Sequence, residues 1–271
     1  MTESNSFHQQ PAFRRFGRVN WLGVWTLYVK EVRRFVKILT QTILAPVTTA
    51  LLFLAIFALA MGRIRADVTG IPFLNFLAPG LVMMSLMQNA FANTSSSLMI
   101  AKVQGNIIDV LMPPLSAGEQ TFAFALGGIT RGLMVAAACM IAIWFFVDFQ
   151  IMHPLAVIYF ALAGAMMMAL IGIMGGIWAD KFDHIQALTN FVVTPLAFLS
   201  GTFYSIGQLP QFAQNIARVN PFFYLIDGFR YGFTGHADSN IMTGVIFTAL
   251  LNAALWMAAY QMFRSGYRLK S

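Results

Sequence analysis

The chain has 271 residues, of which 58% are hydrophobic and only 10% are charged, and its mean hydropathy is +0.70. Soluble domains carry about 25% charged residues, so this composition excludes an ordinary soluble protein and predicts an all-α polytopic membrane protein. The net charge of +7 would also suit a nucleic-acid-binding protein. We attribute it to the ends of membrane spans, because the basic residues flank apolar runs.

The first organised segment follows a polar arm at residues 1–19 and covers residues 20–39. Trp21, Trp25 and Tyr28 recur there at steps of three and four, which is the helical period. The basic residues that gather away from this stripe are Lys30, Arg33, Arg34 and Lys37. The pattern predicts an amphipathic helix that lies in the lipid headgroup layer. It serves either as an interfacial anchor only or also as a docking site for a cytoplasmic partner.

Six apolar segments follow, each close to the roughly 20 residues that a membrane-spanning helix needs. We predict spans over residues 40–61, 73–99, 120–147, 154–179, 185–204 and 240–263, which together form a permease domain at 40–263. An even number of spans places both termini on the same side of the membrane.

The distribution of basic residues predicts that this side is the cytoplasm. The residues that support this orientation are Arg14, Arg15 and Arg18 of the arm, the four basic residues of the amphipathic helix, and Arg264, Arg268 and Lys270 of the tail at 264–271. Arg63 and Arg65 then fall outside, against the rule, but the two ends of the chain outnumber them.

The longer cytoplasmic loop, residues 101–119, is predicted to contain a short amphipathic helix over 104–112. Its apolar residues are Ile107, Ile108 and Leu111, and its polar residues include Asn106 and Asp109. Two prolines end it. Ser116, with Glu119 three residues later, predicts a capping box at the start of the third span.

The stretch at 194–235 is too apolar for a solvated loop and too interrupted by proline and glycine for one spanning helix. Pro210 and Pro221 stand where short helices can begin, because a proline in the first turn loses no intrahelical hydrogen bond. We predict two short helices, over 210–219 and 221–233, in a re-entrant external segment at 205–236 that dips into the membrane without crossing it.

Asp227 and Arg230 are three residues apart on the second of these helices, so they share a face. They form either a desolvated ion pair that fixes the helix or two solvated external charges. The residues expected to shape the external segment are Gly201, Pro210, Asn220, Pro221, Asp227 and Arg230.

Arg131 is the one charge well inside a predicted span. It either contacts an anionic substrate or a pairing partner inside the bundle, or reaches the cytoplasmic interface along its own helix. Gly128 and Gly132 surround it, and Gly172 and Gly176 repeat the same spacing in the fourth span. Small residues four apart allow helices to approach closely, so we expect them at packing contacts, which include the subunit interface as one possibility.

The sequence gives no sign of a catalytic residue or a metal site. Its four histidines are scattered over the arm and loops, and it has no G-x-x-x-x-G-K-[ST] phosphate-binding loop. Two alternatives to a passive transport subunit stay open: a membrane-embedded enzyme acting on lipid or glycan, and an ion-driven secondary transporter.

Several segments together resemble one family. PLAFLSGTFYSIGQLP, NPFFYLIDGFRYGFTG, APGLVMMSLMQNAFANTSSSL, KVQGNIIDVLMPPLSAGE and GGITRGLMV are similar to segments of ABC transporter type 2 permeases, in particular the bacterial YadH/NodJ-like branch. The resemblance runs from about Trp25 to Lys270. It implies six spans in a bacterial inner membrane and an exporter formed by two copies of the chain.

The same resemblance implies two copies of a separate ATPase subunit, which bind ATP and magnesium, and no cofactor on this chain. The cargo would be a glycan, a lipid-linked glycan, a drug or another amphiphile. The helix at 104–112 would be the coupling helix, and the helices after Gly201 would be an outer gate. The coupling residues would be Gln104, Asn106, Ile107, Ile108, Asp109 and Leu111.

Overall fold

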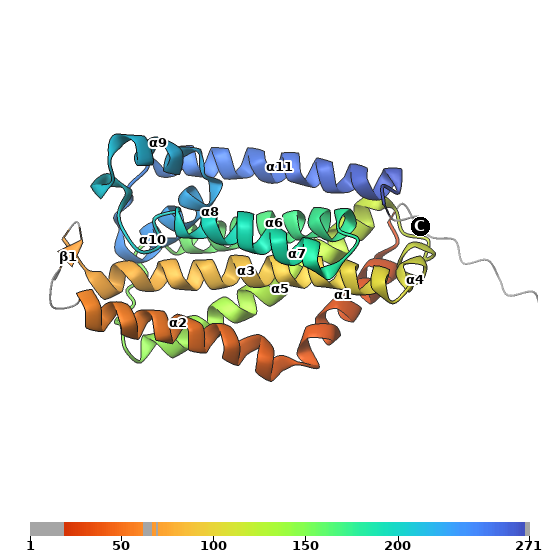
Figure 1. Ribbon diagram of the computed structural model, residues 1–271, viewed down its shortest axis with the longest axis horizontal. Helices are drawn as coiled ribbons and strands as arrows, with labels where there is room; N and C mark the ends of the chain where they lie inside the picture. Colours follow the sequence, from red (N-terminus) through yellow and green to blue (C-terminus); the bar gives the residue numbers. More distant parts are fainter. Residues whose placement is uncertain (1–18, 62–66, 69, 269–271) are drawn as a thin grey trace, which may run out of the picture.

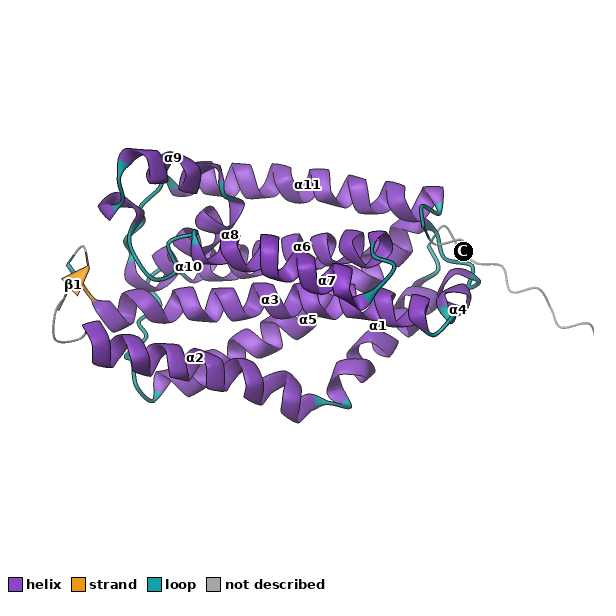
Figure 2. Ribbon diagram, in the orientation of Figure 1, coloured by secondary structure: helices purple, strands orange, loops and turns teal. Residues whose placement is uncertain are grey.

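The computed structural model is a bundle of long helices that run side by side (Figure 1; Figure 2). It describes residues 19–61, 67–68 and 70–268. The predictions that concern the arm at 1–18, Arg63, Arg65 and Lys270 lie outside the described residues. The described chain is helical except for its turns, its loops and one two-stranded hairpin, β1 (Asp67–Val68) with β2 (Ile71–Pro72).

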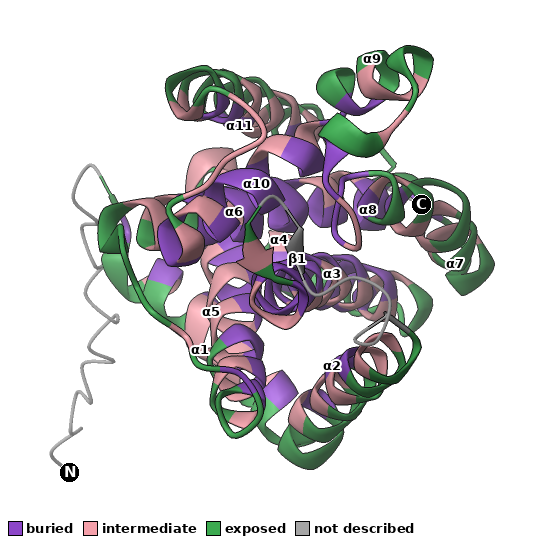
Figure 3. Ribbon diagram, turned by 90° about the vertical axis from the view of Figure 1, so that its left-hand side faces the viewer, coloured by how far each residue is buried: buried purple, intermediate pink, exposed green. Residues whose placement is uncertain are grey.

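Among the residues that the structure describes, four helices are long and apolar enough to cross a membrane. They are α2 (Leu39–Met61), α5 (Ala117–Trp144), α6 (Pro154–Trp178) and α11 (Ile241–Ser265). They coincide with the predicted first, third, fourth and sixth spans to within about three residues at each end. The helix α2 packs loosely and keeps much of its apolar surface exposed, as does α11 (Figure 3), which is the surface that a membrane protein offers to lipid.

The helix α3 (Phe73–Val103) lies at the centre of the bundle, where it packs against α2, α5, α6 and α10 (Figure 1). It is less apolar than the four helices above because its inward face carries a polar run whose groups bond within the protein. Thr94 Oγ1 donates to the main-chain oxygen of Ala169 on α6 at 2.8 Å, and Ser95 Oγ donates to that of Phe91 at 2.8 Å. This helix therefore packs against other helices and is not exposed to lipid.

Both glycine pairs pack against α3. A Cβ on Gly128 would lie 2.9 Å from Thr94 Cγ2, and one on Gly132 would lie 2.9 Å from the main-chain oxygen of Leu86. On α6, a Cβ on Gly176 would lie 3.0 Å from the main-chain oxygen of Ser95, and Gly172 faces the main chain of Phe91. The small residues therefore allow α5 and α6 to approach the same central helix within one chain.

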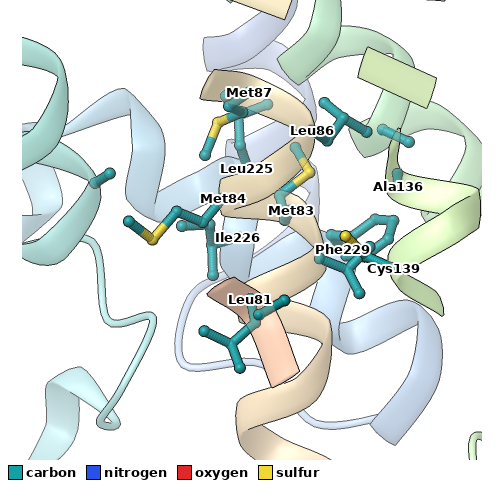
Figure 4. Close-up of a cluster of buried hydrophobic side chains, with 14 of the residues drawn as sticks. Leu81, Met83, Met84, Leu86, Met87, Ala136, Cys139, Leu225, Ile226 and Phe229 are labelled. Carbon is teal, nitrogen blue, oxygen red and sulfur yellow. The ribbon is translucent and has the colours of Figure 1, made fainter. Parts of the chain in front are cut away.

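The main hydrophobic core lies between α3, α5, α6 and α10 (Pro221–Thr234). Figure 4 shows Met83 and Met87 of α3 beside Leu225 and Phe229 of α10, with Cys139 of α5 next to them. Methionine is unbranched and fills irregular gaps, which suits a contact between one long helix and one short one.

The predicted fifth span at 185–204 has different bounds. Its helical run is α7 (Phe182–Leu188), a π-helical turn at Thr189–Val193 and α8 (Thr194–Phe198). Pro195 has no main-chain N–H, which is one reason for the wider turn just before it. The helix ends at Phe198 because the chain turns back at Gly201, whose φ of +75° is costly for a residue with a side chain.

The remaining short elements lie at the two ends of the bundle. At one end are α1 (Trp21–Val36), which slants across the bundle, and α4 (Ile107–Leu111); at the other are a 3₁₀ turn (Ile206–Gln208) and α9 (Gln211–Val219). We call these the α4 end and the α9 end (Figure 1). The first and last described residues both lie at the α4 end, where Arg268 Nη1 lies 3.0 Å from Asp180 Oδ2.

Candidate functional site

At the α4 end, the loop between α3 and α5 presents a small exposed surface. The α4 helix is shorter than predicted, because α3 continues to Val103 and Gly105, with a φ of +73°, then turns the chain. Gln104 and Asn106 lie in this turn, exposed, and not in the helix.

The two isoleucines of α4 face opposite ways. Ile107 is 6% exposed and packs with Val110 into a second hydrophobic cluster, whereas Ile108 is 59% exposed. Asp109 is exposed, Met112 is 75% exposed, and Leu111 is half-buried. Ile107 is therefore a core residue, and Ile108 and Met112 form the apolar part of the surface.

The predicted capping box at the start of α5 is confirmed. Ser116 Oγ accepts from the Glu119 N–H at 3.3 Å, and Glu119 Oε2 accepts from the Ser116 N–H at 2.6 Å. The other oxygen of Glu119 accepts from the N–H of Asn20, the residue that caps α1, at 2.6 Å. One carboxylate thus binds the first residues of α1 and α5 together.

At the α9 end, both predicted short helices are present. Pro210 caps α9 and Pro221 is the first residue of α10. Asn220 is the one residue between them. Its Oδ1 accepts from the Phe222 N–H of α10 at 3.0 Å, and its Nδ2 donates to the main-chain oxygen of Leu196 of α8 at 2.8 Å. The α10 helix does not lie on the surface, since most of it is buried against α3 and α6.

Asp227 and Arg230 form neither of the arrangements considered from the sequence. Both are buried, at 1% and 2% exposure, so they are not solvated external charges. They are also absent from the ion pairs of the described residues.

Each of the two side chains binds a different loop. Asp227 accepts from the N–H groups of Asp238 and Ser239, both at 2.9 Å, and from the Ser239 hydroxyl at 2.6 Å. Arg230 donates to the main-chain oxygens of Gly201 at 2.8 Å and Phe76 at 3.0 Å. A folded loop supplies main-chain groups in fixed positions, and these give the buried charged side chains their hydrogen-bond partners.

A polar cluster between α1, α3 and α5 was not predicted. Glu31 is fully buried, although an amphipathic helix in the headgroup layer should keep it in water. Its Oε1 accepts from Ser97 Oγ at 2.7 Å, and its Oε2 lies 3.4 Å from Arg34 Nη2. Arg34 also donates to the side chain of Asn93 at 2.9 Å and to that of Ser96 at 3.1 Å.

Arg131 belongs to the same region. Its Nη2 donates to Asn89 Oδ1 at 3.3 Å, one helical turn before Asn93 on α3. The neighbouring Thr130 hydroxyl lies 3.1 Å from the Tyr28 hydroxyl of α1. The sequence signal for this cluster is the run Asn93–Ser97, five polar residues inside a predicted span, where polar groups need internal partners.

Comparison with known proteins identifies the family. The family model described as ABC-2 type transporter matches residues 23–234. The chain is 35% identical over 251 residues to the inner membrane transport permease YadH of Escherichia coli K12, with 93% of this chain and 98% of that protein covered. It is 27% identical over 230 residues to nodulation protein J of Rhizobium leguminosarum biovar trifolii, with 81% and 83% covered.

The match covers the elements described above, from the amphipathic helix α1 to the end of α10. Together with the four apolar helices and the similarity to an inner membrane permease, it makes the chain a multi-pass membrane permease that belongs to the ABC-2 type transporter family.

Proposed function

We propose that this chain is the transmembrane subunit of an ATP-driven exporter. Two copies form the translocation pathway, and two copies of a separate ATPase subunit bind ATP and magnesium and contact each permease at its α4 end. The chain itself performs no catalysis. The cargo is a glycan, a lipid-linked glycan, a drug or another amphiphile, and the membrane is the bacterial inner membrane with both termini in the cytoplasm.

The single observation that carries this proposal is the exposed surface of the loop that holds α4. Ile108 and Met112 are exposed at the end where the first and last described residues lie, with Gln104, Asn106 and Asp109 beside them. Exposed apolar side chains with a polar rim are typical of a protein–protein contact. Ile107 and Val110 hold this surface against the bundle, so that a displacement of α4 reaches α3 and α5.

We further propose that α3 and the run from α7 to α8 also cross the membrane, which gives six spans. With 31 residues, α3 is about 46 Å long, enough to cross a bilayer. The chain enters α9 and leaves α10 at the same end of the bundle, so it does not cross the bundle within these two helices. This supports a re-entrant outer gate built from Gly201, Pro210, Asn220 and Pro221.

The outer surface of α9 supports contact between two copies. Phe212 and Val219 are both 76% exposed, beside an apolar groove of about 520 Å³ that includes Leu196 and Leu199. A cysteine at Val219 should therefore link two copies in native membranes. Wild type is the control, because its one cysteine, Cys139, is buried. Without a linked dimer, the placement of α9 between copies is wrong.

The function is tested by co-expressing the permease with a candidate ABC ATPase subunit and measuring cargo-dependent ATP hydrolysis in nanodiscs. We expect Ile108→Asp to leave the permease folded and to abolish the stimulation of the ATPase by the permease. The matched control is Ile151→Asp in the loop between α5 and α6, where the isoleucine is 59% exposed as Ile108 is, which introduces the same charge away from α4. Hydrolysis of ATP by the permease alone would overturn the proposal.

A further inference from the structure

The buried polar atoms that lack partners are concentrated in one place. Among the residues that the structure describes, four buried side-chain nitrogen or oxygen atoms make no hydrogen bond. Three of these atoms are Arg34 Nε, Asn93 Nδ2 and Arg131 Nε. All three are N–H donors, and all belong to the polar cluster between α1, α3 and α5.

These donors are close together because of how their helices meet. Asn89 and Asn93 are one turn apart on α3, so they share a face. Asn89 accepts from Arg131 on α5, and Asn93 accepts from Arg34 on α1. Gly127 of α5 permits this approach, since a Cβ there would lie 2.8 Å from Glu31 Cβ and 3.5 Å from Asn93 Nδ2.

The charge in this cluster is also unbalanced. The cluster contains two guanidinium groups, on Arg34 and Arg131, but one carboxylate, that of Glu31. Glu31 already accepts from both Ser97 and Arg34. A buried donor without an acceptor destabilises the fold, and a charged donor does so more strongly. The cluster therefore lacks an acceptor and a negative charge at the same place.

An open groove on the outer side of α1 shares Arg34 with the cluster. It has a volume of about 740 Å³, and the residues that line it include Trp25, Lys30, Arg33, Arg34 and Lys37, all on α1 or directly after it. Arg34 belongs to both places, since its side chain is 24% exposed while its Nη2 reaches Asn93. Basic side chains beside a tryptophan are suited to an anionic headgroup at the membrane interface.

We propose that Arg34, Asn93 and Arg131 form a binding site for the phosphate group of an anionic amphiphile. A phosphate supplies several acceptor oxygens and the missing negative charge, and arginine binds it through more than one N–H group. The amphiphile is either a phospholipid of the bilayer or a phosphorylated cargo. Only the second source depends on the export function proposed above.

The test measures binding by the full-length permease, without an ATPase, in nanodiscs of neutral lipid. The probe is dioctanoyl phosphatidic acid, and the matched probe is dioctanoylglycerol, which has the same chains and no phosphate. We expect wild type to bind the phosphatidic acid at least tenfold more tightly. Arg34→Gln and Arg131→Gln should each weaken that binding about tenfold, which corresponds to about 1.4 kcal/mol.

Two further variants separate this site from general attraction and from misfolding. Arg264→Gln removes the same charge from an exposed position of α11, outside the groove on α1, and we expect it to change binding less than twofold. Asn89→Asp supplies Arg131 with a carboxylate, so it should keep or raise thermal stability and still weaken phosphatidic acid binding. If Arg264→Gln costs as much as Arg34→Gln, or if wild type does not discriminate between the probes, the proposed site is wrong.

A final comparison separates the two sources of the phosphate. In the complex with the ATPase, addition of ATP should release bound phosphatidic acid if the site receives cargo, and should leave it bound if the site holds a resident lipid. Both outcomes require the site. If the ATPase complex does not form, the proposed export function fails, whereas binding by the permease alone still decides the site.

Discussion

Asp227 and Arg230 lie one helical turn apart on α10, and each holds a different loop at the α9 end of the bundle. Asp227 binds the main chain at Asp238 and Ser239, and Arg230 binds the main chain at Gly201. Asp238 extends the connection, because its Oδ1 accepts from Ser205 Oγ at 2.9 Å. The loop before α9 and the loop after α10 are thus fixed to one buried helix.

Replacing Arg230 should destabilise the protein substantially. Arg230→Gln leaves the main-chain oxygens of Phe76 and Gly201 without their donor, and the guanidinium also loses its place 3.7 Å from the Phe76 ring centre. We expect a loss of about 3 kcal/mol in the free energy of unfolding. Arg218→Gln, at an exposed position of α9, is the control and should have no measurable effect in the same thermal unfolding assay in detergent.

Replacing Asp227 should act locally on two loops. In Asp227→Ala the N–H groups of Asp238 and Ser239 lose their acceptor, and Asp238 in turn loses its position beside Ser205. We expect faster hydrogen–deuterium exchange in both loops and an unchanged rate in α5. Asp148→Ala changes an exposed carboxylate and should leave the exchange of both loops as in wild type. Equal exchange in Asp227→Ala and wild type would show that these bonds do not hold the loops.

The packing of α5 against α3 should not tolerate a methyl group at two positions. In Gly128→Ala the new Cβ would lie 2.9 Å from Thr94 Cγ2, and in Gly132→Ala it would lie 2.9 Å from the Leu86 main-chain oxygen. We expect each change to cost about 1–3 kcal/mol of stability through overpacking. Gly118→Ala, on the same helix, meets nothing closer than 3.8 Å, so thermal unfolding of this control should match wild type or exceed it.

Removal of the buried carboxylate on α1 should loosen that helix. Glu31→Gln takes the counter-charge from Arg34 and weakens the bond from Ser97, which should cost about 1–3 kcal/mol. Trypsin cleavage after the basic residues of α1 should then be faster. Asp183→Asn changes an exposed acid at the start of α7 and serves as the control. A cleavage rate equal to that of wild type would mean that Glu31 does not fix α1.

Local chemistry explains the elements that the sequence predicts well. Proline at the start of a helix and a serine–glutamate capping box depend on neighbours within four residues. Pro210, Pro221, Ser116 and Glu119 therefore lie in the structure where the sequence places them. The long apolar helices are predicted for the same reason, because their length and composition are properties of one segment.

Contacts between distant segments explain what the sequence did not predict. The amphipathic pattern of residues 20–39 shows two faces, but not that Ser97 would donate to Glu31 and that Asn93 would accept from Arg34 on the polar face. Likewise, the spacing of Asp227 and Arg230 predicts a shared face but not the loops that return to meet it. The burial of Ile107 beside exposed Ile108 depends on how α4 sits on the bundle, which no five-residue pattern specifies.

The carboxylate of Glu119 has a mechanical consequence. It joins Asn20 at the start of α1 to Ser116 at the start of α5, and Asn20 Nδ2 also donates to the Pro114 main-chain oxygen at 3.2 Å. A displacement of the loop that holds α4 must therefore move α1 and α5 together. The chain next turns at Lys37 and Ile38, between α1 and α2.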